Sequence, residues 1–141
     1  MKFRLLSILL LVCWSLTAQA GEVEVRDAWV SLPPPGAEVV AAYMVVLNME
    51  AQGHRLRRVS CDEASEAEFH AMRRHGNMMQ MVHLEGVDLP AGERVVFAPG
   101  GMHIMLRGLR RTLKRGEDVH LHLFLEDGRR LDIAAPVRDM R

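Results

Sequence analysis

Cysteine is scarce in this chain of 141 residues, which contains only Cys13 and Cys61. Cys13 lies within Leu5–Leu16, an apolar run of 12 residues that follows two basic residues and precedes an Ala-x-Ala sequence ending at Ala20. This arrangement is typical of a secretory signal peptide. We therefore expect cleavage after Ala20, a mature domain formed by residues 21–141, and export to the periplasm.

The mature chain then keeps Cys61 alone, so an intramolecular disulfide is excluded even in an oxidising compartment. A lipid anchor at Cys13 is not expected, because Val12 stands where a lipoprotein signal carries a small residue. A membrane span is not expected either, since spanning takes ~20 apolar residues and no later segment comes close.

An excess of basic residues is also absent. Removal of Lys2 and Arg4 leaves 16 Lys and Arg against 18 Asp and Glu, which gives a net charge of −2. A nucleic-acid-binding protein would concentrate basic charge on one face. The composition argues against that class.

Short segments rich in β-branched or alternating apolar residues recur along the mature chain, with Gly and Pro between them. They predict strands over residues 22–30, 39–48, 55–61, 66–72, 78–84, 94–98, 102–106, 118–125 and 130–137. The last two are joined across Asp127-Gly128, a strong hairpin signal. Helix-favouring residues leave a short helix over residues 62–68 as an alternative. We predict one all-β domain, a β-sandwich or barrel.

Methionine is unusually abundant, with nine of the ten in the mature chain and several of them near histidines. His103 and Met105 are two residues apart in a predicted strand, so both side chains project from one face. His70 and Met81 lie on either side of a polar turn. If the turn is centred on His75-Gly76 they are directly opposite, about 5 Å apart at Cβ; if it is centred on Gly76-Asn77 they are diagonal neighbours on one face.

Two thioethers and two imidazoles form a neutral, soft donor set that selects Cu(I) over harder ions. Zinc would prefer a cysteine or carboxylate beside the histidines. The sequence therefore predicts that one Cu(I) per chain is bound by His70, Met81, His103 and Met105.

The alternative for each of these residues is ordinary packing, since Met often fills gaps in a core. His83 follows Met81 by two residues on the same face and is the best spare ligand. His120 and His122 point away from an apolar strand face, which indicates a solvated surface or a weak second metal site. The remaining residues are assigned to packing or to exposed positions: Cys61 to a small buried hydrophobe, Met72, Met78 and Met79 to packing or a rim, and His75 to an exposed turn.

The spacing His70-x10-Met81-x21-His103-x-Met105 resembles the copper-ligand motif of the periplasmic PCuAC copper chaperones. Further similar stretches are Asp27-Ala28-Trp29, VDLPAG at 87–92, PGGMHIM at 99–105 and GLRRTLKRG at 108–116, so that the resemblance covers nearly the whole mature chain. Cys61, His120 and His122 are not part of the family motif.

The resemblance implies a cupredoxin-like β-sandwich with an exposed Cu(I) site. It also implies delivery of copper to the cytochrome c oxidase subunit that carries the binuclear CuA centre, or to a copper-transfer assembly factor. We expect a monomeric metallochaperone and not an enzyme. The alternatives are a blue-copper electron carrier, which needs a Cys thiolate with two His, and a metal-free β-sandwich binding module.

Overall fold

The computed structural model describes residues 21–140, all of them in strands, turns and loops. The expected signal peptide and Cys13 lie outside these residues. The strands are β1 (Val23–Ser31), β2 (Val39–Asn48), β3 (His54–Cys61), β4 (Ala64–His75), β5 (Met78–Leu84), β6 (Val87–Leu89), β7 (Arg94–Phe97), β8 (Met102–Leu109), β9 (Asp118–Leu125) and β10 (Arg130–Arg138). The all-β prediction is confirmed. The helix considered for residues 62–68 is wrong, because that segment enters β4.

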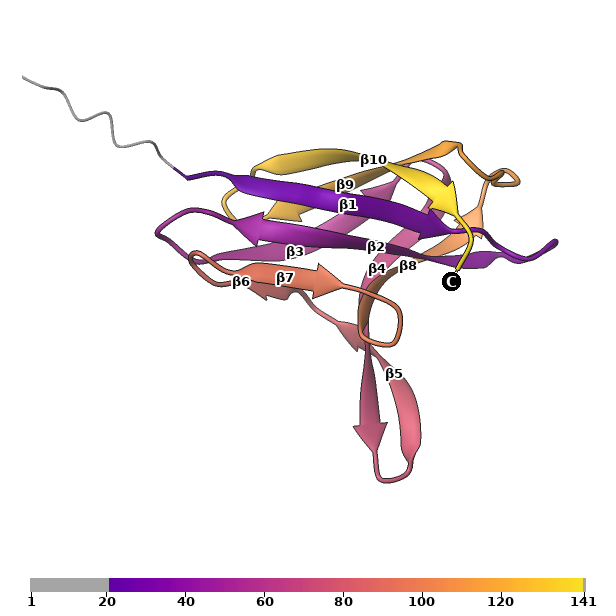
Figure 1. The fold of residues 1–141 in the computed structure, drawn as a ribbon, viewed down its shortest axis with the longest axis horizontal. Helices are drawn as coiled ribbons and strands as arrows, with labels where there is room; N and C mark the ends of the chain where they lie inside the picture. Colours follow the sequence, from indigo (N-terminus) through magenta and orange to yellow (C-terminus); the bar gives the residue numbers. More distant parts are fainter. Residues whose placement is uncertain (1–20, 141) are drawn as a thin grey trace, which may run out of the picture.

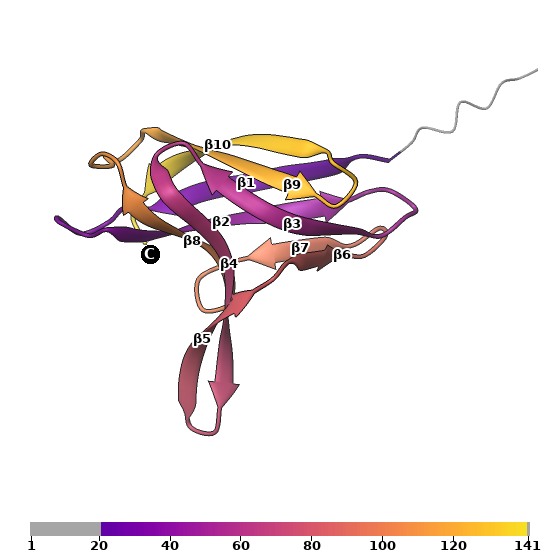
Figure 2. The same ribbon diagram turned by 180° about the vertical axis from the view of Figure 1, so that it is seen from behind.

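The strands follow one another in the order β5-β4-β8-β2-β1-β10-β9-β3-β6, and β7 pairs with β2 beside β8. The sheet folds over into two layers, one built on β1, β2, β4 and β8 and the other on β3, β9 and β10 (Figures 1 and 2). A short parallel pairing of β1 with β10, at Val30 with Val137, connects the layers. The result is the expected sandwich.

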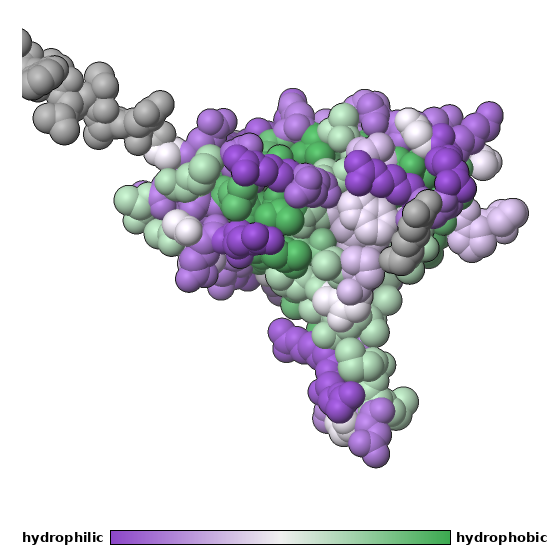
Figure 3. All heavy atoms as spheres, viewed as in Figure 1, coloured by the Kyte–Doolittle hydropathy of each residue, from purple (hydrophilic) through white to green (hydrophobic). Residues whose placement is uncertain are grey.

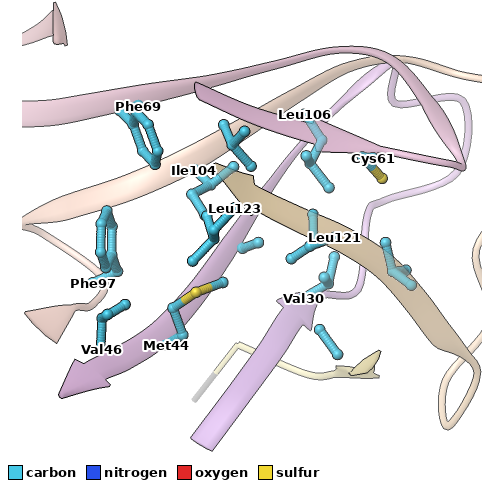
Figure 4. Close-up of a cluster of buried hydrophobic side chains, with 14 of the residues drawn as sticks. Val30, Met44, Val46, Cys61, Phe69, Phe97, Ile104, Leu106, Leu121 and Leu123 are labelled. Carbon is cyan, nitrogen blue, oxygen red and sulfur yellow. The ribbon is translucent and has the colours of Figure 1, made fainter. Parts of the chain in front are cut away.

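The core lies between the two layers and consists of aliphatic side chains with two phenylalanines. Strand β9 buries its odd-numbered residues from Val119 to Leu125, as its alternation predicts. Met44 of β2 and Ile104 of β8 pack from the other layer (Figure 4). Cys61 belongs to this core, which confirms its interpretation as a buried hydrophobe.

Strand β3 was the weakest strand prediction, because Leu56 and Val59 are three residues apart and do not alternate. Both are nevertheless buried. The pairing of β3 with β9 shifts register between Leu56 and Arg58. This irregularity inserts one residue and returns Val59 to the core face.

Strands β4 and β5 form a hairpin that projects from the body of the sandwich (Figures 1 and 2). The turn is Gly76-Asn77, and Gly76 has a φ of 62°, a conformation that glycine adopts readily. The hairpin's surface carries polar and apolar side chains next to each other (Figure 3). Because β5 pairs with β4 alone among the described strands, the hairpin leaves one edge of this sheet free.

Candidate metal centre

Three histidines lie in a row across the outermost strands of one layer. The pairing of β4 with β8 places His70 opposite His103, and the pairing of β4 with β5 places His70 opposite His83. The ring centroids are 5.9 Å apart for His70 and His103 and 5.6 Å apart for His70 and His83. Directly paired residues project from the same sheet face, so all three imidazoles share one face.

Methionine sulfurs flank this row on the same face. Met105 follows His103 by two residues and is paired with Glu68, whereas Met81 is paired with Met72. His70 and Met81 are therefore diagonal neighbours. Of the two expected turns, Gly76-Asn77 is correct and His75-Gly76 is wrong.

Met81, His103 and Met105 line one open cavity of about 430 Å³. Its other walls come from the loop after β1, from β2, from Met72 and from the C-terminal segment, and include Leu32, Pro33, Tyr43 and Met140. His70 does not line the cavity but lies beside His103. The structure thus brings all four predicted ligands to one region of the sheet.

These four residues differ sharply in exposure. His70, His103 and Met105 are 5%, 6% and 9% exposed, whereas Met81 on the projecting hairpin is 45% exposed. The opposite face of the same strands carries core residues such as Phe69 and Ile104. The candidate centre is therefore anchored in a rigid sheet and reached from solvent past Met81.

Hydrogen bonds fix the orientation of two of the imidazoles. His103 Nδ1 lies 3.1 Å from the Gly101 carbonyl oxygen, which can only accept, so Nδ1 carries the proton and Nε2 keeps its lone pair. His70 Nε2 lies 2.9 Å from Glu68 Oε2 and donates to this carboxylate. A carboxylate or carbonyl partner of this kind is typical of metal-binding histidines.

His70 Nδ1 is buried without a hydrogen-bond partner among the described residues. Leaving a buried polar atom unpaired costs about 1–3 kcal/mol. A metal ion bound at Nδ1 would satisfy this atom. Together with the Nε2 lone pair of His103 and two thioether sulfurs, this nitrogen completes a neutral donor set that fits a soft, monovalent ion.

One negative and one positive side chain, Glu68 and Arg107, lie next to the centre. The hydrogen bond from His70, followed by the nearby Arg107 guanidinium, lowers the pKa of Glu68 below its usual value. Glu68 is therefore a carboxylate at neutral pH. Arg107 Nε also lies 3.3 Å from Met105 Sδ, so this cation is placed next to a predicted sulfur ligand.

The other residues singled out in the sequence lie elsewhere. His120 and His122 are on the second layer and point outward as predicted; His120 contacts Glu63, and His122 contacts Asp132 and Asp62. The hydrogen bond that His122 donates to the Asp132 carboxylate raises the pKa of His122. Burial raises the pKa of the Cys61 thiol to about 11.

One residue of the centre, Glu68, was not identified from the sequence. Glu68 precedes His70 by two residues in a strand, and this same-face carboxylate was the signal that could have identified it. Met72 lines the cavity and is paired with Met81, which agrees with its predicted place in packing or a rim. Its position follows from the observed hairpin register.

The family model described as "Putative lipoprotein LpqE-like" matches residues 23–137. The chain belongs to the LpqE-like family. A curated relative of this LpqE-like protein, named "Putative lipoprotein Lxx21020" in Leifsonia xyli subsp. xyli (strain CTCB07), is 32% identical over 122 residues, which are 86% of this chain and 72% of the relative.

Solved structures agree with this assignment and with the PCuAC resemblance. CuI-DR1885 from Deinococcus radiodurans is 34% identical to this LpqE-like chain, with a TM-score of 0.71 over 86% of this chain and 82% of the other. The copper-bound PCuAC domain from PmoF2 is 24% identical, with a TM-score of 0.73 over 86% and 96%. The likeness to the PmoF2 domain confirms the fold. The likeness to CuI-DR1885 is close enough in sequence to confirm the family as well. Among the described residues, no helix is long and apolar enough to cross a membrane.

Proposed function

We propose that this protein is an exported metallochaperone that binds one Cu(I) ion through His70, Met81, His103 and Met105. The observation that carries the proposal is that the four side chains lie on one sheet face, where the buried His70 Nδ1 has no hydrogen-bond partner among residues 21–140. Two related structures, CuI-DR1885 and the copper-bound PCuAC domain from PmoF2, support the choice of metal.

The donor chemistry explains a preference for Cu(I). Thioether sulfurs are soft and neutral, and they bind Cu(I) in preference to Zn(II), Mg²⁺ or Ca²⁺. With two neutral imidazoles, the bound centre keeps only the charge of the metal. No thiolate is needed, so binding is compatible with an oxidising compartment.

The geometry also suits release. Met81 is the one half-exposed ligand, so an acceptor can displace it first while the three buried ligands still hold the ion. The PCuAC resemblance supplies the acceptor that we propose, the CuA-bearing subunit of cytochrome c oxidase or an assembly factor that serves it. We infer a carrier and not an enzyme.

The two competing functions have less support. A blue-copper carrier needs a thiolate ligand. Cys61 is a core residue of β3, which pairs with β9 in the layer that does not carry the candidate centre. A metal-free module would not explain why the buried His70 Nδ1 has no hydrogen-bond partner within the described part of the chain. If the protein shows no intense blue colour with Cu(II), the blue-copper carrier is excluded. Stoichiometric binding of Cu(I) would exclude the metal-free module.

X-ray absorption of the Cu(I)-loaded mature protein tests the donor set directly. We expect one copper per chain with two sulfur and two nitrogen neighbours. A shell of nitrogen and oxygen alone, or preference for zinc, would refute the proposal. Transfer from the loaded protein to an isolated CuA domain, followed by the appearance of CuA absorption, tests delivery.

The export step has its own measurement. Mass spectrometry of the protein recovered from the periplasm should give a chain that begins at Gly21 without lipid. A lipid-modified Cys13 at the N-terminus would overturn this processing and agree instead with the lipoprotein names of the relatives.

A further inference from the structure

His83 and Glu68 form a second group of metal-binding side chains around His70. Glu68 Oε2 lies 2.9 Å from His70 Nε2 and 3.9 Å from His83 Nδ1. One ligand atom from each of the three residues lies within 4.8 Å of the other two. Such spacing allows all three atoms to contact one ion after small side-chain rotations.

The strands, and not flexible loops, hold this group together. Glu68 and His70 are two residues apart in β4, and His83 is the direct partner of His70 in β5. His70 is buried, whereas the His83 side chain is 49% exposed. The group therefore opens to solvent at the free edge of the sheet, where water can complete the coordination of an ion.

Its chemistry differs from that of the Cu(I) donor set. One carboxylate and two imidazoles provide no sulfur and one negative charge, which suits a divalent ion of borderline hardness. Among first-row divalent metals, Cu(II) binds such nitrogen and oxygen ligands most tightly. We propose that Glu68, His70 and His83 form a second copper site, selective for Cu(II), that shares His70 with the Cu(I) site and is therefore never filled together with it. The sharing of His70 between the two sites rests on the proposed Cu(I) function.

Mutual exclusion follows from the chemistry of the imidazole. A neutral ring has one protonated nitrogen and one lone pair. In the Cu(I) state His70 binds through Nδ1, while its Nε2 proton is donated to Glu68. In the Cu(II) state His70 binds through Nε2, which moves the proton to Nδ1 and removes the lone pair that Cu(I) requires. Glu68 correspondingly changes from hydrogen-bond acceptor to ligand.

The experiment compares Cu(II) and Cu(I) binding in three variants of the mature protein. His83→Gln removes a ligand of the Cu(II) set alone, and Met81→Leu removes a ligand of the Cu(I) set alone. His75→Gln is the matched control, because His75 lies on the same hairpin but on the other strand face. Cu(II) binding is followed by electron paramagnetic resonance, and Cu(I) binding by anaerobic competition with a chelator.

We expect the parent to bind one Cu(II) with nitrogen couplings from two imidazoles. His83→Gln should weaken Cu(II) binding by at least about tenfold, since losing even an outer partner of a metal ligand costs about 10–100-fold. The same variant should keep Cu(I) affinity, Met81→Leu should keep Cu(II) affinity, and His75→Gln should keep both. Unchanged Cu(II) binding in His83→Gln would overturn the second site, whereas failure of Cu(I) binding in the parent would overturn the proposed function instead.

Exclusion is tested with Ag(I), a soft monovalent ion that exchanges no electron with Cu(II). One equivalent of Ag(I) should release Cu(II) from the parent protein, with the signal of bound Cu(II) replaced by that of a chelator complex. Full retention of bound Cu(II) beside bound Ag(I) would show two independent sites and overturn the sharing of His70.

Discussion

Substitution of Met81 tests metal binding with less effect on folding than substitution of any other residue of the centre. Its side chain is 45% exposed on the edge hairpin, whereas Met105 is 9% exposed. Replacement of Met81 by Leu should change the free energy of unfolding of the apo protein by no more than about 0.5 kcal/mol, as for other surface positions. Replacement of Met105 by Leu conserves volume in a packed site and should cost under about 1.5 kcal/mol.

Both substitutions remove one of two sulfur donors, and we expect each to lower Cu(I) affinity at least about tenfold, which is about 1.4 kcal/mol. A ligand that binds only the folded state stabilises it by RT ln(1 + [L]/Kd), so the copper-induced stabilisation should fall by the same amount at a fixed free Cu(I) concentration above Kd. For a domain of this size, that shortfall is about 4–6 °C in the copper-induced rise of Tm.

The assay is thermal unfolding under anaerobic conditions, with and without Cu(I) held by a chelator. Met44→Leu is the control, because Met44 is 1% exposed in the core and lies on the opposite sheet face from the centre. It should lower the apo Tm slightly and keep the full copper-induced rise. If Met81→Leu kept the full rise as well, Met81 would be a surface residue without a role in binding.

Three further predictions concern Glu68 and the histidines. Glu68→Ala should lower Cu(I) affinity about 10–100-fold because it removes the acceptor that orients His70, whereas Glu66→Ala, at an exposed position two residues earlier, should leave Cu(I) affinity unchanged in the same chelator competition. Cu(I) affinity should fall on acidification because protons compete with copper for the histidine nitrogens, with a slope approaching two protons per copper in the parent and one in His103→Ala; a flat profile would exclude histidine ligation. The pKa of His122 is raised, first by its hydrogen bond with Asp132. Protonated His122 therefore stabilises the folded protein fully below about pH 6.5, and this contribution is lost as pH rises through the raised pKa of the folded state. The excess stability of the parent over His122→Gln in urea unfolding should therefore shrink above that pH, and a constant difference would contradict the assignment.

The sequence alone determined the class of fold and the side of each strand on which the candidate ligands lie. Period-two alternation in residues 118–125 and the Asp127-Gly128 turn predicted β9 and β10 with little error. Both hairpin turns considered for residues 70–81 placed His70 and Met81 on one face. The two registers differ by two residues in pairing, and strand side chains repeat every two residues.

Tertiary structure decided what the local pattern cannot contain. The pairing of His70 with His103 depends on the contact of β4 with β8, which are far apart in the chain, whereas the pairing of His70 with His83 is set by the β4–β5 hairpin. That same contact helps to bury His70, whose Nδ1 has no hydrogen-bond partner in the part of the chain that the structure describes. The hydrogen bond from its Nε2 to Glu68 lies within β4 itself. Burial arises from neighbours distant in sequence. The four-residue motif therefore predicted the candidate ligands and His83 as a spare one, whereas only the folded sheet showed that His70 is buried with Glu68 and His83 beside it.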